Sequence, residues 1–304
     1  MSRAKRVFSC IKVAFVSVVG LLSGCEQSSG SLQFVVSAEE TIRAGLDPAS
    51  GAADQEEAIQ DGWTIRYERF LVAIGNFRVS PELSEESVGS ERDPRIHLVD
   101  LVQVPESGLD LYRIDEIAAR RYLGVSYDTP IAPADALANA ATGVSAADVE
   151  LMSSQGWSIW ISGQASKGNK TLRFAWGLPA PTAYSECKAE EGDFGLVVPE
   201  GGAGLLQASL HGDHFWFNSF PGGSEGEVQR YADWLELADR DGNGEVTVAE
   251  LQASPAAELF PSDRYSLSAP SDLGVLRTAY DFVVIQASTL GHLQGEGECV
   301  FSRL

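Results

Sequence analysis

Positive charge is scarce in this sequence. Lys and Arg number 22 against 43 Asp and Glu in 304 residues, which gives a formal net charge of −21. So few cations cannot build a strongly basic face, which excludes nucleic acid as a partner and electrostatic docking onto anionic lipid headgroups. Hydrophobic residues make up 44% of the chain, a content typical of globular proteins.

Familiar catalytic motifs are also missing. The sequence contains no H-E-x-x-H, no P-loop and no G-x-G-x-x-G. Gly222–Gly226 fits the G-x-S-x-G nucleophile pattern, but Pro221 precedes it and Ser224 is better explained as a helix cap. The sequence therefore favours a non-enzymatic protein, with an enzyme of unassigned chemistry as an alternative.

No apolar run is long enough to cross a bilayer as a helix, which takes about 20 residues. The run Val13–Leu22 follows a basic segment and has the length of a signal-peptide core. It leads into Leu22-Ser23-Gly24-Cys25, which resembles the lipobox of bacterial lipoproteins. We expect residues 1–24 to be a lipoprotein signal peptide and 25–31 a tether whose Cys25 carries lipid. The membrane is then a partner through this lipid, at the bacterial outer membrane or periplasmic face, and no protein partner is identifiable.

Cysteine is rare as well, with four residues in all. Cys10 leaves with the expected signal peptide and Cys25 takes the lipid, so Cys187 and Cys299 remain in an oxidising compartment. Two leftover thiols outside the cytoplasm most simply pair, and we expect a Cys187–Cys299 disulfide. The alternatives are two free thiols, or a Cys299 that binds metal beside His292.

Residues 32–220 read as a β domain. Apolar residues tend to alternate along this part, and Trp157–Ile161 and Thr171–Trp176 flank the turn signal Lys167-Gly168-Asn169. Many short strands with Gly/Pro-rich connections predict a mainly β fold, specifically an antiparallel β-sandwich. The segments 47–61 and 130–143 read as surface loops.

Residues 221–304 change to a helical period and are expected to pack on the sandwich. The spacing of apolar residues predicts a helix from Val228 to Ala238, started by the capping box Ser224–Glu227. A second helix is predicted from Ser271 to Leu290, with Gly291 at its C-terminal cap; the run Phe282–Ile285 is compatible with a strand instead.

The segment Asp239–Glu250 matches the twelve-residue EF-hand loop at its constrained positions. Side-chain oxygens come from positions 1, 3, 5, 9 and 12, a main-chain carbonyl comes from position 7, and Gly244 permits the turn at position 6. The predicted Ca²⁺ ligands are Asp239, Asp241, Asn243, Glu245, Thr247 and Glu250. No second loop of this kind is present, and Pro255 shortens the exiting helix, so we expect a lone hand that holds a structural ion.

Histidines offer a second candidate metal site. Three of the four fall in two short Gly-flanked segments, His211-Gly212-Asp213-His214 and Gly291–Gly297, which contains His292. Imidazoles suit copper or zinc, and three of them leave an open coordination position. The alternative is that each is a hydrogen-bonded histidine at the end of an element.

Several segments resemble known proteins. Trp63–Val72, Gly156–Ile159, Phe174–Gly177, His211–Phe215 and Gly291–Gly297 resemble myxobacterial-type secreted lipoproteins, which carry the same Asp239–Glu250 loop. More distantly, the order Val99-Asp100-Leu101, Met152, Gly156-Trp157-Ser158 and Gly163 is similar to methanobactin-associated periplasmic copper-binding proteins. The second resemblance implies a β-sandwich that binds copper through histidine.

Together these features predict a calcium-binding, membrane-anchored lipoprotein that is not an enzyme. The alternative from another class is a periplasmic copper- or zinc-binding protein that uses His211, His214 and His292.

Overall fold

The structure is a computed structural model that describes residues 28–50, 57–83, 87–189, 192–221 and 228–304. The expected signal peptide, Cys25 and the capping box Ser224–Glu227 lie outside the described residues. Strands hold 42% of the residues and helices 18%, so the mainly β prediction is confirmed. Among the described residues, none of the helices has the length and apolar character needed to cross a membrane.

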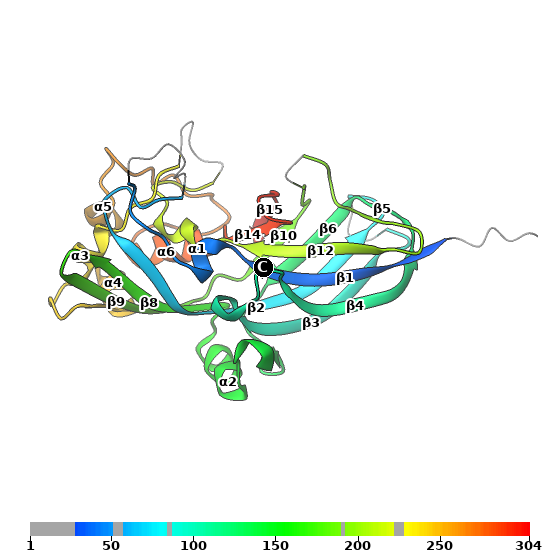
Figure 1. The fold of residues 1–304 in the computed structure, drawn as a ribbon. Helices are drawn as coiled ribbons and strands as arrows, with labels where there is room; N and C mark the ends of the chain where they lie inside the picture. Colours follow the sequence, from blue (N-terminus) through cyan, green and yellow to red (C-terminus); the bar gives the residue numbers. More distant parts are fainter. Residues whose placement is uncertain (1–27, 51–56, 84–86, 190–191, 222–227) are drawn as a thin grey trace, which may run out of the picture.

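Two large sheets organise the described chain (Figure 1). The first has the order β14-β12-β1-β4 and contains β1 (Ser29–Ala38), β4 (Leu109–Ala118), β12 (Ala203–Leu210) and β14 (Gly291–Leu293). The second has nine strands: β2 (Thr64–Ser80), β3 (Glu91–Asp100), β6 (Gly124–Thr129), β7 (Leu137–Ala138), β8 (Ile159–Lys167), β9 (Lys170–Leu178), β10 (Thr182–Ser185), β13 (Glu245–Val246) and β15 (Val300–Arg303). A small third sheet pairs β5 (Arg120–Tyr122) with β11 (Leu196–Val198).

Pairing within the sheets is mixed rather than wholly antiparallel. β8 and β9 form the antiparallel hairpin that the turn signal predicted, with Lys167 opposite Lys170. In contrast, β1 runs parallel to β12, β3 to β7 and β13 to β9. The expected antiparallel arrangement is therefore found in most strand pairs, but it is wrong for these three, whose strands run in the same direction.

Helices are short and gather mainly at one end of the molecule, opposite β5 (Figure 1). They are α1 (Glu40–Arg43), α2 (Ala146–Gln155), α3 (Trp234–Ala238), α4 (Val248–Ala253), α5 (Ala256–Leu259) and α6 (Ala279–Ala287), with 3₁₀ turns at Leu101–Gln103, Ala140–Thr142 and Asp213–Trp216. Of these helices, α1, α2 and α5 were not predicted from the sequence. The segment 130–143, expected to be a loop, contains β7 and the 3₁₀ turn Ala140–Thr142. The capping box of Ser145 with Asp148 marks the start of α2.

The helix expected from Val228 starts six residues later. The main chain around Arg230 pairs instead with Ile59 and Phe217. The start of α3 is held by a distant carboxylate, since Asp61 Oδ2 accepts hydrogen bonds from the main-chain N–H groups of Ala232 and Asp233, each at 2.7 Å. Tertiary pairing thus overrides the helical period in this segment.

The helix expected from Ser271 to Leu290 is also shorter. α6 begins after Thr278, whose hydroxyl accepts from the Asp281 N–H in a capping box, and its C-terminal cap is Ser288. Gly291 is not a cap: it opens β14, where a Cβ atom would lie 2.5 Å from the ring of Tyr184. The strand alternative for Phe282–Ile285 is wrong, because these residues lie inside α6.

One hydrophobic core joins the two sheets and the C-terminal segment. Phe34 of β1 contacts Phe77 of β2 with ring centroids 5.4 Å apart, and Trp176 of β9 contacts Trp234 of α3 at 5.9 Å. The two parts of the chain that meet at residue 220 therefore share buried surface and strand pairing, because β13, β14 and β15 all extend sheets built from earlier strands.

Candidate metal centres

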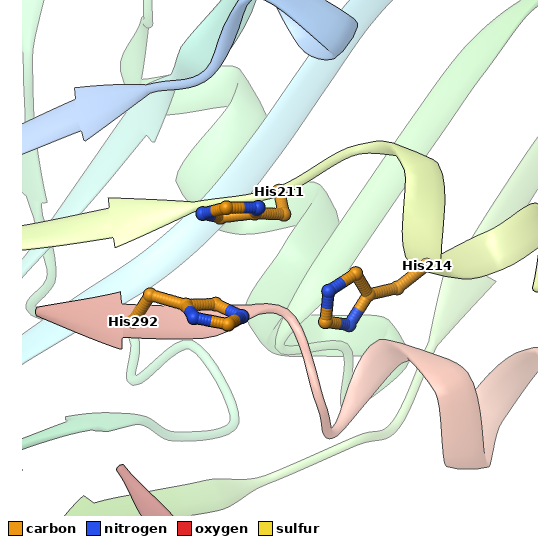
Figure 2. Close-up of side chains that lie close together, drawn as sticks. All are labelled: His211, His214 and His292. Carbon is orange, nitrogen blue, oxygen red and sulfur yellow. The ribbon is translucent and has the colours of Figure 1, made fainter. Parts of the chain in front are cut away.

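His211, His214 and His292 come together at the end of the first sheet (Figure 2). His211 directly follows β12, and His292 lies on β14, which pairs with β12 so that Ser209 is opposite His292. His214 belongs to the 3₁₀ turn that comes next in the chain. One ring nitrogen from each histidine lies within 4.8 Å of the others. The two histidine segments singled out in the sequence therefore converge on one place.

The rings pack closely in the interior. The centroids of His211 and His292 are 4.0 Å apart, and His214 lies 5.3 Å from His292. His214 Nδ1 is 2.9 Å from Thr289 Oγ1 and its ring packs on Phe217. The strand pairing and the buried 3₁₀ turn thus fix the three rings before any ligand binds.

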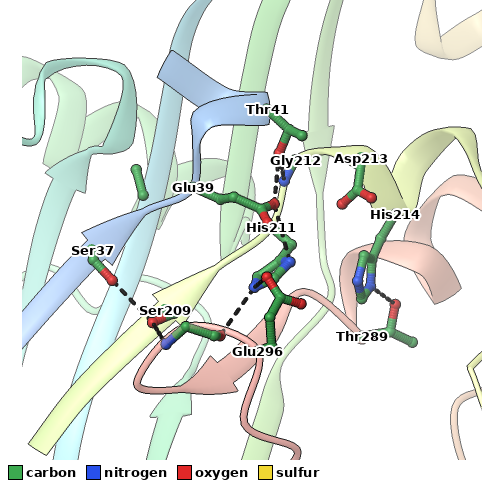
Figure 3. A network of polar contacts seen from close by, with 12 residues as sticks. Ser37, Glu39, Thr41, Ser209, His211, Gly212, Asp213, His214, Thr289 and Glu296 are labelled. Carbon is green, nitrogen blue, oxygen red and sulfur yellow. Dashed lines mark hydrogen bonds and ion pairs between the residues drawn. The ribbon is translucent and has the colours of Figure 1, made fainter. Parts of the chain in front are cut away.

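Carboxylates surround His211 (Figure 3). Its Nδ1 is 3.0 Å from Glu39 Oε2, and its Nε2 lies 3.2 Å from the Gly295 carbonyl oxygen and 4.0 Å from Glu296 Oε1. Because both ring nitrogens face acceptors, His211 is arranged as an imidazolium. A metal at this group must displace one of these contacts and the proton.

The three histidines differ in charge as a result. Burial lowers the pKa of His214 to about 3 and that of His292 to about 4, so both rings are neutral at neutral pH. Burial also acts to lower the pKa of His211, but the hydrogen bond and charge of Glu39 outweigh it and raise this pKa to about 9. Neutral imidazoles are the form that binds copper or zinc, so two ligands are ready and the third requires loss of a proton.

Asp213 adds a buried negative charge beside the histidines. Its Oδ2 accepts a hydrogen bond of 2.7 Å from Arg230 Nε, while its Oδ1 is buried with no hydrogen-bond partner. Burial opposes ionisation, but charge interactions with His214, at the low pH where that ring is protonated, and with Arg230 and His211 keep the pKa of Asp213 below its usual value. The ionised Asp213 favours a cation nearby.

Glu39 and Asp213 were missed as site residues. The position of Asp213 between two candidate histidines in the sequence is the signal that could have identified it. Glu39 reaches His211 because β1 and β12 are parallel neighbours, with Ala38 opposite Leu210. The residues that follow these two strands therefore meet, although they are far apart in the chain.

A cavity of about 260 Å³ adjoins the histidine group. His214, His292 and Thr289 contribute to its wall, as do Glu298 and Phe301 from the last part of the chain. Cys299 also lines it, and its Sγ lies 2.04 Å from that of Cys187, which is disulfide-bonding distance. This link holds the last strands close to β10 and next to the histidines.

The Asp239–Glu250 loop lies at the other candidate metal centre. Carboxylate oxygens of Asp239, Asp241 and Glu250 lie within 4.8 Å of one another. α3 ends at Ala238, directly before the loop, and α4 begins at Val248 within it and ends two residues before Pro255. The arrangement is thus a helix, a turn rich in oxygen donors and a second, short helix.

Main-chain N–H groups already orient these oxygens. Asp239 accepts from the N–H groups of Asn243 and Gly244, and Asn243 Oδ1 accepts from the Glu245 N–H at 2.7 Å. Glu250 accepts from Arg240 and Thr247 at 2.9 and 2.8 Å. Although burial acts to raise it, these hydrogen bonds keep the pKa of Glu250 below its usual value, so the carboxylate is ionised at neutral pH.

The lone loop pairs with the main sheet. Its segment Glu245–Val246 runs parallel to β9 opposite Arg173 and Phe174, and Trp176 Nε1 donates to the Val246 carbonyl at 2.8 Å. This pairing ties the loop to the main sheet.

Comparison with known protein families, curated proteins and solved structures finds no match for this chain.

Proposed function

We propose that the protein is a calcium-binding, membrane-anchored lipoprotein that is not an enzyme. The observation that carries the calcium part is the convergence of Asp239, Asp241 and Glu250 in a loop between two helices, supported by β9. Calcium prefers several oxygen ligands in a loose geometry, and this loop offers carboxylate, amide and main-chain oxygens. Asp239, Asp241, Asn243, Glu245, Thr247 and Glu250 are the residues that hold the ion in this proposal.

The same supporting contacts favour a structural ion over a switch. The helices beside the loop are short, and Val246 and Leu251 are fully buried in the common core. A sensor hand opens a Met-rich groove, whereas this chain has only two Met. Calcium here joins the C-terminal segment to the main sheet.

A second candidate function is copper or zinc binding at His211, His214 and His292. The specific observation in its favour is the approach of three buried or half-buried ring nitrogens to within 4.8 Å. Three imidazoles are a common donor set for zinc and copper. Glu39 stands behind His211 in the position of the outer carboxylate that orients many metal-binding histidines.

Metal analysis of the purified protein tests both parts. After dialysis against mixed low concentrations of calcium, copper and zinc, we expect one calcium per chain and one copper or zinc per chain. Calcium alone supports only the first function, and copper or zinc alone supports only the second. A protein that retains neither contradicts both.

The lipid anchor is tested by Cys25→Ser. Without the Cys25 thiol no diacylglycerol can be attached, and we expect most of the protein to move from the membrane fraction to the soluble fraction. Cys10→Ser is the matched control, because Cys10 lies within the expected signal peptide, and it should leave the protein on membranes. If Cys25→Ser protein still sediments with membranes after a salt wash, the anchor lies elsewhere.

A further inference from the structure

No described carboxylate lies within 4.8 Å of all three histidine nitrogens, although Glu39 and Asp213 form a second group of this kind with His211. Among the described residues, the group of nitrogens within 4.8 Å contains His211, His214 and His292 alone. Zinc and copper commonly take four ligands, and a centre with three protein ligands keeps a position for water or an added ligand. The direction of this fourth position depends on which side of the three rings is open.

The packing of the three rings leaves one side open. His211 is enclosed by Glu39 and by the main chain at Gly295, and only 4% of the residue is exposed. His214 and His292, in contrast, both line the cavity of about 260 Å³. A metal held between these two rings adjoins the cavity, so its remaining position is reached from there.

The lining of the cavity sets the charge of what can enter. Glu298 is the charged carboxylic residue among those that line it, and neither Lys nor Arg is among them. Glu39 and Glu296 add carboxylates beside His211, while the charge of Asp213 is balanced by its pairing with Arg230. An anion that approaches the metal is repelled by these carboxylates, whereas a neutral molecule is not.

The volume and lining of the cavity further limit which ligands it can hold. A cavity of about 260 Å³ lies below the range usual for drug-sized ligands, roughly 300–1,000 Å³, so only a small molecule fits. Phe301 supplies an apolar wall, and the Thr289 hydroxyl is already engaged with His214 and with the Gln286 carbonyl. The cavity thus offers an apolar surface and the metal, with few other hydrogen-bonding groups.

We propose that the fourth position of the three-histidine metal opens into this cavity and takes a small neutral ligand with a nitrogen or sulfur donor, in preference to an anion. This inference rests on copper or zinc binding at the three histidines. It adds a ligand-binding function to what is otherwise a closed metal site.

The test uses the purified full chain loaded with one equivalent of Cu²⁺ and followed by electron paramagnetic resonance. Imidazole and azide are added separately as neutral and anionic probes. We expect imidazole to shift the copper spectrum and to bind more tightly than azide. Glu298→Gln should strengthen azide binding while imidazole binding stays the same. Glu258→Gln, an exposed acid on α5 outside the cavity lining, should alter neither.

A cavity-filling variant tests the route of entry. Phe301→Trp enlarges a wall residue and should fill part of the cavity, so imidazole affinity should fall about tenfold or more with copper binding retained. If copper does not bind through the histidines, both the metal function and this inference fail. If copper binds but imidazole does not change its spectrum, only the inference fails. The same holds if Phe301→Trp leaves imidazole affinity unchanged. Equal affinity for azide and imidazole in the unmodified chain overturns the preference for a neutral ligand.

Discussion

Glu250→Gln is expected to abolish the rise in melting temperature that calcium produces in the unmodified protein. A ligand that binds only the folded state stabilises it by RT ln(1 + [L]/Kd), about 2.7 kcal/mol at a hundredfold excess over Kd. For a chain of this size, this corresponds to a rise of roughly 5 °C. In the proposed site Glu250 stands at position 12, where a carboxylate binds calcium with both oxygens, so its amide removes the strongest ligand.

The substitution is chosen to leave the apo protein intact. Glu250 also forms the capping box of α4 with Thr247, and the Gln carbonyl oxygen can keep this bond. The hydrogen bond from the Arg240 N–H to the other oxygen is lost, so the melting temperature without calcium should fall only by the effect of one exposed hydrogen bond, about 1 kcal/mol. Thermal unfolding followed by circular dichroism, with chelator and with added calcium, measures both values.

Glu245→Gln is the matched control. It makes the same chemical change five residues earlier, but position 7 of the loop supplies its main-chain carbonyl and the Glu245 side chain is exposed. The calcium response should survive. A calcium-dependent shift that persists in both Glu250→Gln and Asp239→Asn would show that the ion binds somewhere other than this loop.

Sequence patterns predicted those parts of the structure whose determinants are local. The β8–β9 hairpin depends on one turn at Gly168, and the Asp239–Glu250 loop on twelve consecutive residues. Capping boxes at Ser145 and Thr278 are equally local and would have located the starts of α2 and α6. The helical period alone misplaced α6, because apolar residues before Thr278 continue the pattern outside the helix.

Non-local pairing accounts for the features that the sequence did not predict. The start of α3 depends on Asp61, more than 170 residues earlier, and on the pairing of Arg230 with Ile59. Glu39 reaches His211 only through the parallel alignment of β1 and β12. Since no turn or period in the sequence records a parallel pair, the approach of Glu39 to the histidine group could not be derived from it.

The histidine group differs from the proposed calcium loop in that one of its candidate ligands, His211, must lose a proton before it can bind a metal. His292→Gln removes one of three imidazoles and should lower Cu²⁺ or Zn²⁺ affinity by about 100-fold or more, since even outer-shell changes cost 10–100-fold. His97→Gln is the control, because His97 is the remaining histidine and lies on β3, away from the three-histidine group. It should leave metal affinity unchanged in a competition titration against a chromogenic chelator.

The pH dependence of this affinity distinguishes three histidine ligands from two. His214 and His292 are neutral above about pH 4, so they impose no proton competition at neutral pH. His211 keeps its proton up to about pH 9, and a metal that binds it must release that proton. Affinity should therefore rise about tenfold per pH unit from pH 7 and level off near pH 9. Glu39→Gln removes the carboxylate that holds the proton on His211. The metal affinity of this variant should therefore level off at a lower pH. If affinity in the unmodified protein is independent of pH between 7 and 9, the metal does not bind His211, and only His214 and His292 remain as imidazole ligands.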